Sequence, residues 1–218
     1  MVRETDVVII GGGVHGASAA YHLARSGRHV TLLEKGHIGA GSSGTSGGII
    51  RSHYTSETMV RLAHRAATLW PTLEQELGHP VDYVRNGIVV AVGPDNRQNL
   101  ERNVRMQQRL GVATETIAAH EIRRWIPEFR TEGLALAAYE AQGGYADPYA
   151  TAVAFAKKAQ TLGAEVLTDT EVTRIETDNG AVRGVTTNAG TIRAPLVVNC
   201  AGAWARRIAR TAGIELPV

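Results

Sequence analysis

The glycine-rich turn near the start of the chain constrains the fold more than any other feature. An apolar run, Val7–Ile10, leads directly into the spacing Gly11-x-Gly13-x-x-Gly16, and apolar residues at helical spacing follow. A second apolar run then ends on Glu34. A strand, a glycine motif, a helix and a strand that ends in an acid are together the context that identifies a dinucleotide-binding βαβ unit. We therefore expect an α/β fold built on a parallel sheet.

Each part of this unit has a physical role toward a dinucleotide. The first glycine allows a tight turn, the second lets a pyrophosphate approach the backbone, and the third lets the helix pack on the sheet. The helix N-terminus offers N–H groups and a partial positive charge to phosphates, and the acid can accept hydrogen bonds from a ribose. The predicted contacts are Gly11, Gly13, Val14, His15, Gly16 and Glu34. The alternative is a glycine-rich turn in some other α/β protein.

The segment after Glu34 is rich in glycine, serine and threonine and has two interpretations. Such a composition is typical of a flexible linker. This segment, however, leads through Ile49 and Ile50 to Arg51 and then directly into a helical pattern. Small residues here would let the backbone approach a long cofactor, and Ser42, Ser43 and Thr45 would offer hydroxyls to phosphate oxygens. We favour a cofactor-binding loop, because loops on rigid scaffolds commonly carry function.

The middle of the chain does not continue the strand–helix alternation. We expect a helix from residue 56 to 70, a strand at 88–92, a charged helix at 96–110, a short helix at 120–125 and a strand at 134–139. Such a pattern favours an inserted lobe with a partial antiparallel sheet. Asp147 and Pro148 then predict a new helix start, and residues 171–186 predict a hairpin. A last strand at 196–200 would return the chain to the first sheet.

These patterns predict two domains. Residues 1–80 and 146–218 would form a Rossmann-like domain, and residues 81–145 would form part of a substrate or cap domain. A net charge of +2 argues against a nucleic-acid partner. No apolar stretch is long enough to cross a bilayer and no signal peptide is evident, so we expect a cytoplasmic protein. The eight histidines are dispersed, which predicts no metal site, and the single cysteine, Cys200, predicts a packed residue.

Three segments together resemble the FAD-dependent amine oxidoreductases of the D-amino-acid oxidase, glycine oxidase and sarcosine oxidase superfamily. They are VVIIGGGVHGASAAYHLARSGRHVTLLEK, GSSGTSGGIIRSHY and VVNCAGAWA. Residues 170–175 match the adenine-side hairpin of that family. The combination spans nearly the whole chain and is most similar to the sarcosine and dimethylglycine branch. The resemblance implies a Rossmann-like FAD-binding domain with a partial antiparallel-sheet substrate lobe.

The resemblance also assigns residues to the cofactor. The glycines of the first motif would hold the pyrophosphate, and Glu34 would hold the adenosine ribose. Val172 would contact adenine through its backbone. Further contacts are implied for Lys35, Ser42, Ser43, Thr45, Gly47, Ala201, Gly202 and Trp204. Some relatives tether flavin through a histidine, but the matching position here is Gly47 or a neighbour, so we expect non-covalent FAD.

Arg51 is the implied catalytic residue, because an arginine at this position in sarcosine oxidases helps to hold the substrate carboxylate. Without the resemblance, an exposed arginine would be the simpler interpretation. The implied reaction is oxidation of a C–N bond in a small amino acid or N-methylated amine by hydride transfer to flavin. One alternative is a flavin-dependent 2-hydroxy-acid or glycerol-phosphate dehydrogenase. Another is a non-catalytic FAD-binding fragment or subunit.

Family members usually run well past 218 residues, and a second glycine-rich flavin contact is not evident. We therefore expect that the C-terminal part of the family fold is missing through truncation, or that a partner subunit supplies it. A minimal flavin-binding protein is the third explanation. A truncated chain should expose apolar surface and bind FAD weakly.

Overall fold

The computed structural model describes residues 3–217 and divides into two compact units. The first holds the described parts of 1–47, 74–81 and 147–218, and the second holds 48–73 and 82–146. Helix α3 (Trp70–Leu77) belongs partly to each. Each unit has its own sheet and core, so each is described by itself.

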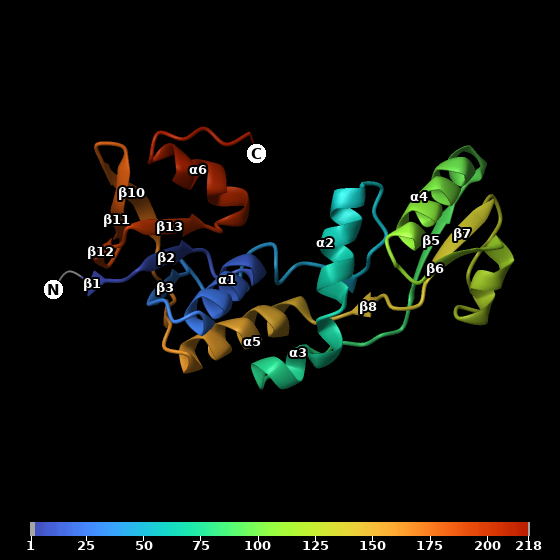
Figure 1. Cartoon of the computed structure of the whole chain (residues 1–218), viewed down its shortest axis with the longest axis horizontal. Coiled ribbons are helices and arrows are strands. Elements are labelled where there is room, and N and C mark those ends of the chain that lie inside the picture. The colour runs from blue at the N-terminus through green and yellow to red at the C-terminus, as the bar shows by residue number, and fades with distance from the viewer. Residues whose placement is uncertain (1–2, 218) are drawn as a thin grey trace. The chain divides into compact units, whose positions relative to one another are not determined.

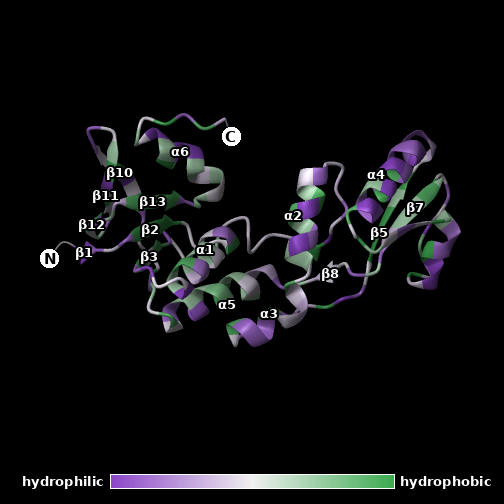
Figure 2. Ribbon diagram, viewed as in Figure 1, coloured by the Kyte–Doolittle hydropathy of each residue, from purple (hydrophilic) through white to green (hydrophobic). Residues whose placement is uncertain are grey.

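A four-stranded parallel sheet is the centre of the first unit. Its order is β13 (Leu196–Asn199), β2 (Val7–Ile10), β3 (Val30–Leu33) and β9 (Glu165–Leu167). All residues of β2 and β3 are buried, as expected for strands covered on both faces. Figure 2 shows the apolar character of these strands. The predicted α/β fold and the return of the last strand to this sheet are confirmed.

Two helices cover one face of this sheet. Helix α1 (Val14–Arg25) follows the glycine turn, and α5 (Pro148–Thr161) packs along it (Figure 1). The rings of Tyr21 and Phe155 lie 5.7 Å apart where the helices meet. Helix α5 begins as predicted, because the Asp147 carboxylate accepts a hydrogen bond of 2.8 Å from the Ala150 N–H and Pro148 follows the cap.

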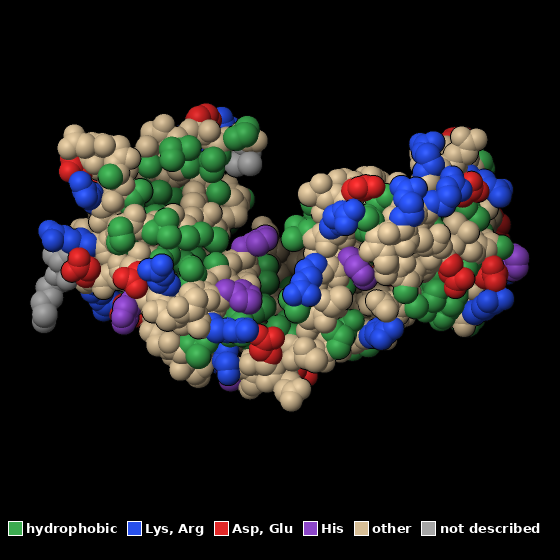
Figure 3. Space-filling view, in the orientation of Figure 1, with side chains coloured by type: hydrophobic (Ala, Val, Ile, Leu, Met, Phe, Trp, Pro, Cys, Tyr) green, Lys and Arg blue, Asp and Glu red, His purple; other side chains and the backbone are tan. Residues whose placement is uncertain are grey.

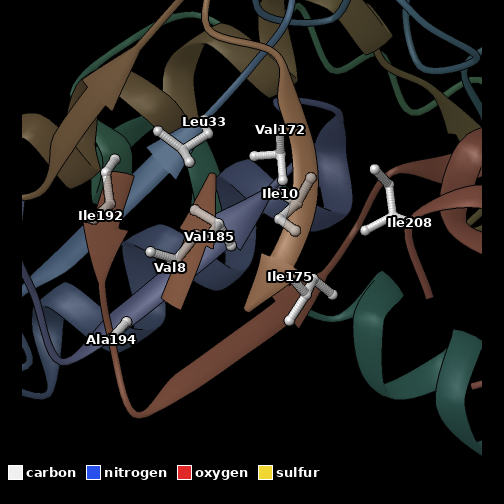
Figure 4. Packing of buried hydrophobic residues seen from close by; sticks show 9 residues of the cluster. All are labelled: Val8, Ile10, Leu33, Val172, Ile175, Val185, Ile192, Ala194 and Ile208. Carbon is white, nitrogen blue, oxygen red and sulfur yellow. The ribbon is translucent and has the colours of Figure 1, made fainter. Parts of the chain in front are cut away.

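A second sheet covers the opposite face. Its order is β1 (Arg3–Glu4), β12 (Gly190–Arg193), β11 (Ala181–Thr187) and β10 (Val172–Asp178). Strands β10 and β11 form the predicted hairpin. Figure 4 shows the shared core, to which Val8 and Ile10 contribute from β2, and Val185 and Ile192 from the second sheet. Helix α6 (Ala205–Arg210) closes this core through Ile208.

The second unit contains the expected antiparallel sheet. Its order is β5 (Ile88–Val92), β7 (Leu136–Glu140) and β6 (Thr114–Ile117), and α4 (Arg97–Arg109) packs on it through Leu100 and Val104. The short strands β4 (Ile49–Ile50) and β8 (Gly144–Tyr145) pair with each other. Short 3-10 helices occupy Pro94–Asn96, Ala119–Arg124 and, in the first unit, Gly202–Trp204.

Several predicted boundaries differ from the structure. The segment 48–73, expected with the first domain, belongs to the second unit, because β4 pairs with β8 and Val60 packs on Met106 and Val112. The helix expected over 56–70 is two helices, α2 (Glu57–Ala67) and α3. Strand β6 was not expected, since its sequence, TETI, alternates polar and apolar residues over only four positions. Within residues 3–217, no helix has the length and apolarity that a membrane span requires.

Candidate functional site

The first unit contains a cavity of about 390 Å³ at the carboxyl ends of its parallel strands. This edge is where open α/β sheets bind their ligands. Figure 3 shows hydrophobic side chains gathered over the part of this unit where β13 and α6 lie. The cavity is lined by many of the residues predicted for the cofactor: Gly11, Gly13, His15, Glu34, Lys35, Ser42, Ser43, Val172, Ala201, Gly202 and Trp204.

The glycine turn joins three strands at the base of this cavity. The Gly11 N–H donates to the Leu33 carbonyl, and the Cys200 N–H donates to the Ile10 carbonyl, both at 2.8 Å. Gly11 has a φ of +104°, which favours glycine. A Cβ on Gly16 would overlap the Gly11 carbonyl oxygen, so helix α1 can approach the turn only without a side chain there. Gly16 itself does not line the cavity, but its lack of a side chain determines how closely α1 lies against the turn.

Glu34 is a buried carboxylate fixed by two backbone amides. It is 8% exposed and lies immediately after β3. One of its oxygens accepts a hydrogen bond from the Gly12 N–H at 2.6 Å, and the other accepts one from the Gly36 N–H at 2.9 Å. Carboxylate oxygens accept more than one hydrogen bond each, so Glu34 retains capacity toward the cavity. The role of Gly12 was missed, although three consecutive glycines were its signal.

The serine-rich loop is fixed to the glycine turn. The Ser43 hydroxyl accepts a hydrogen bond of 2.9 Å from the Val14 N–H, which is an unpaired donor at the start of α1 in an isolated helix. The Gly39 N–H donates to the Gly12 carbonyl at 2.9 Å. These bonds exclude the flexible-linker interpretation for 39–43. Thr45 and Gly47 are exposed and lie outside the residues that line the cavity, and the Thr45 hydroxyl donates to the Ser42 carbonyl at 3.3 Å.

A cation–aromatic contact joins two walls of the cavity. The Lys35 ammonium nitrogen, after β3, lies 3.5 Å from the ring centroid of Trp204, in the turn before α6. That turn is stabilised by Asn199, whose side-chain amide donates to the Ala205 carbonyl at 2.8 Å. Such contacts are attractive when the cation lies over the ring face.

Two residues of α6, one positively charged and one apolar, also line the cavity and were not predicted. They are Arg207 and Ile208, and Arg207 lies 3.9 Å from the Glu171 carboxylate across the cavity lining. Their signal was helical spacing, because positions 204, 207 and 208 share one helix face. Cys200 lines the cavity too, and burial raises the pKa of its thiol, so the neutral form predominates at neutral pH.

Arg51 belongs to the second unit. It is exposed, and its guanidinium carbon lies 5.3 Å from the ring centroid of Tyr54. The next residue anchors this segment, because the Ser52 N–H donates to both carboxylate oxygens of Glu140 at 2.8 and 3.0 Å. Both residues are almost fully buried, at 1% and 2% exposure. Among residues 3–217, no three histidine, cysteine, aspartate or glutamate side chains are grouped to hold a metal ion.

Known proteins are similar to this chain in sequence and in fold. A sequence profile described as FAD-dependent oxidoreductase matches residues 6–218. Human mitochondrial sarcosine dehydrogenase is 33% identical over 98% of this chain and 24% of its own length. The mitochondrial pyruvate dehydrogenase phosphatase regulatory subunit of Mus musculus is 32% identical over 93% of this chain and 23% of its own length.

A solved structure, L-proline dehydrogenase from P. horikoshii, superposes with a TM-score of 0.94 at 33% identity, covering 100% of this chain and 58% of that one. The chain therefore spans about a quarter of the two curated relatives and somewhat more than half of the solved structure. Because the family profile covers almost all of its residues, the chain belongs to the FAD-dependent oxidoreductase family.

Proposed function

We propose that this chain binds the adenosine and pyrophosphate part of FAD in an oxidoreductase that oxidises the C–N bond of a small amino acid or N-methylated amine. The observation that carries the proposal is the first-unit cavity, where a fixed carboxylate, a glycine turn and a helix N-terminus meet. Those groups suit, respectively, ribose hydroxyls, a pyrophosphate and its negative charge. The names of relatives, sarcosine dehydrogenase and L-proline dehydrogenase, support the substrate class.

The lining fits the parts of FAD in order. Glu34 would accept hydrogen bonds from the adenosine ribose, and Val172 would contact the adenine. A Cβ on Gly13 would meet the Ser43 hydroxyl at 3.0 Å, a tight contact, so the absence of a side chain at Gly13 lets the serine-rich loop lie close to the turn, where both would face the pyrophosphate. Val14, His15, Ser42 and Ser43 would complete the phosphate site. Thr45 and Gly47 would contact the cofactor farther along the serine-rich loop.

The chemistry is divided between cofactor and chain. When bound, FAD would supply the acceptor for a hydride from the carbon next to the amine nitrogen. Arg51 would orient the substrate by pairing its guanidinium with the carboxylate, a geometry that suits two parallel hydrogen bonds. Orientation of this kind lowers the barrier by fixing the reacting groups in place. We propose that turnover also needs the part of the relatives' length that this chain does not span, whether on the same chain or a partner.

The test uses the purified protein together with the part, on the same chain or on a partner, that supplies the rest of the relatives' length, and its absorbance spectrum before and after acid precipitation. A flavin spectrum that passes into the supernatant supports non-covalent FAD. Anaerobic addition of sarcosine or L-proline should then bleach the flavin, whereas 2-hydroxyglutarate or glycerol phosphate should not. Bleaching by the hydroxy compounds alone would assign the protein to the alternative dehydrogenase class.

A second candidate is a non-catalytic FAD-binding subunit. It is favoured by the similarity to a protein named as a phosphatase regulatory subunit, which is nearly as close in identity as sarcosine dehydrogenase. A flavin-loaded protein that no amine and no hydroxy acid can bleach would favour this candidate.

A further inference from the structure

One wall of the first-unit cavity is a short turn rather than part of a sheet. Ala201, Gly202 and Trp204 line the cavity from the connection between β13 and α6. Gly202 has a φ of +54°, and the Trp204 N–H donates to the Ala201 carbonyl at 2.9 Å in a single 3-10 turn. Hydrogen bonds of this kind have poorer geometry than those of an α-helix, so side-chain support decides how firmly such a turn is held.

The Asn199 side chain gives that support at both ends of the turn. Its Oδ1 accepts a hydrogen bond of 3.2 Å from the Ala201 N–H, which lies two residues ahead, as in an Asx turn. Its Nδ2 donates a hydrogen bond of 2.8 Å to the Ala205 carbonyl, where α6 begins. One amide therefore joins the residue before Gly202 to the residue after Trp204.

Asn199 is itself fixed to the parallel sheet. It is the last residue of β13 and pairs with Ile10 on β2. The next residue continues this pairing, because the Cys200 N–H donates to the Ile10 carbonyl at 2.8 Å. The turn is therefore anchored, through Asn199, to the strand that leads into the glycine motif.

The side chain that depends most on this anchoring is Trp204. Its ring centroid lies 3.5 Å from the Lys35 ammonium nitrogen, on the wall that follows β3. The ring also lies against the serine-rich loop, since a Cβ on Gly41 would be in ordinary contact with it at 3.7 Å. Both contacts require that the turn keeps its conformation, because Trp204 is 44% exposed and reaches across the rim of the cavity.

We propose that Asn199 is a positioning residue for the cofactor, which holds the turn so that Ala201, Gly202 and Trp204 face FAD. A chain whose turn occupies other conformations binds more weakly, in proportion to the fraction that is competent to bind. This inference rests on the proposed function, because it assigns the cavity to FAD.

Asn199→Leu is the principal variant, because it removes both hydrogen bonds at similar size and adds no charge near the phosphate site. Fluorescence titration of the apoprotein should show about 10-fold weaker FAD binding, as expected when two backbone groups lose their partner. Asn199→Ser keeps a hydroxyl that can accept from the Ala201 N–H but is too short to reach Ala205, so binding should weaken only about threefold. Asn103→Leu, at a half-buried asparagine of α4 in the second unit, is the control and should bind as the wild type does.

A double-mutant cycle separates positioning from a general loss of stability. In the wild type, Trp204→Leu should speed FAD dissociation roughly two- to fivefold. In Asn199→Leu, where the ring is already displaced, the same change should add almost nothing. Equal effects of Trp204→Leu in the two backgrounds would overturn the proposal. If Asn199→Leu does not fold, Asn199→Ser carries the same cycle.

The position of the indole ring has a readout that does not involve FAD. Trp70→Phe and Trp125→Phe leave Trp204 as the single tryptophan of the chain. In that background, Asn199→Leu should shift the emission of Trp204 to longer wavelength and increase its quenching by acrylamide. Unchanged emission and quenching would overturn the positioning of Trp204 by Asn199. A wild type that binds no FAD would contradict the proposed function, whereas the emission shift would still support the positioning of the ring.

Discussion

At the scale of single residues, the site depends on groups that are held by backbone rather than by other side chains. Glu34 receives two amide N–H groups, and the Ser43 hydroxyl receives one from α1. These bonds hold the side chains before any ligand arrives. Preorganisation of this kind reduces the ordering cost of binding.

Glu34→Gln should weaken FAD binding about 10- to 100-fold, since hydrogen bonds to a charged acceptor contribute roughly 1.5–3 kcal/mol. Titration of the apoprotein with FAD, followed by flavin fluorescence, measures the change. Glu115→Gln, on an exposed position of β6 in the second unit, is the control and should bind as the wild type does. Equal FAD affinities of the two variants would contradict the assignment of Glu34 to the ribose site.

The contact between Lys35 and Trp204 should slow the release of FAD by joining two walls of the cavity. Lys35→Met and Trp204→Leu should each speed dissociation roughly two- to fivefold, from a cation–π energy of about 0.5–1 kcal/mol at an exposed site. The double variant should release FAD no faster than the more affected single variant. Strictly additive effects in stopped-flow dissociation would show that the two residues act independently.

At the scale of elements, the glycine turn and helix α1 form one rigid unit. Gly16 faces the Gly11 carbonyl, and the turn itself joins β2, β3 and β13. The position of α1, and with it the phosphate site, therefore depends on a close backbone contact.

Gly16→Ala should lower the free energy of unfolding more than Gly163→Ala does. At Gly16 the added methyl overlaps backbone that cannot move away cheaply. At Gly163, which ends α5 with a φ of +95°, no described atom lies within 4 Å of an added Cβ, so only strain of about 1–2 kcal/mol is expected. Urea unfolding of both variants gives the comparison, and a smaller loss in Gly16→Ala would refute the close-contact account.

The segment 51–54 should make stability depend on pH through His53. Its pKa is lowered in the folded protein, mainly by burial, so the unfolded chain binds a proton more readily. Stability is therefore complete above the unfolded pKa of about 6.5 and falls as pH decreases below it. Urea midpoints measured from pH 7.5 to 5 should fall less steeply in His53→Asn than in the wild type. Parallel curves would show that His53 titrates normally.

At the scale of the whole molecule, the sequence predicted the parallel sheet and most of the cavity lining, because the glycine motif and the apolar strands are local signals. The sequence did not predict that residues 48–73 belong to the second unit, because this depends on pairing between β4 and β8, which are distant in sequence. Arg207 was missed for a similar reason. Helical spacing places Arg207 on the same face as Trp204, but which face of α6 meets the cavity follows from how α6 packs on the second sheet.

The most direct test of the account is competition at the first-unit cavity. The account assigns this chain the adenosine and pyrophosphate part of FAD, so the purified apoprotein should bind FAD, and ADP should displace it. FMN, which lacks the adenosine, should bind far more weakly. Equal binding of FMN and FAD, or no displacement of FAD by ADP, would contradict the assignment of this cavity.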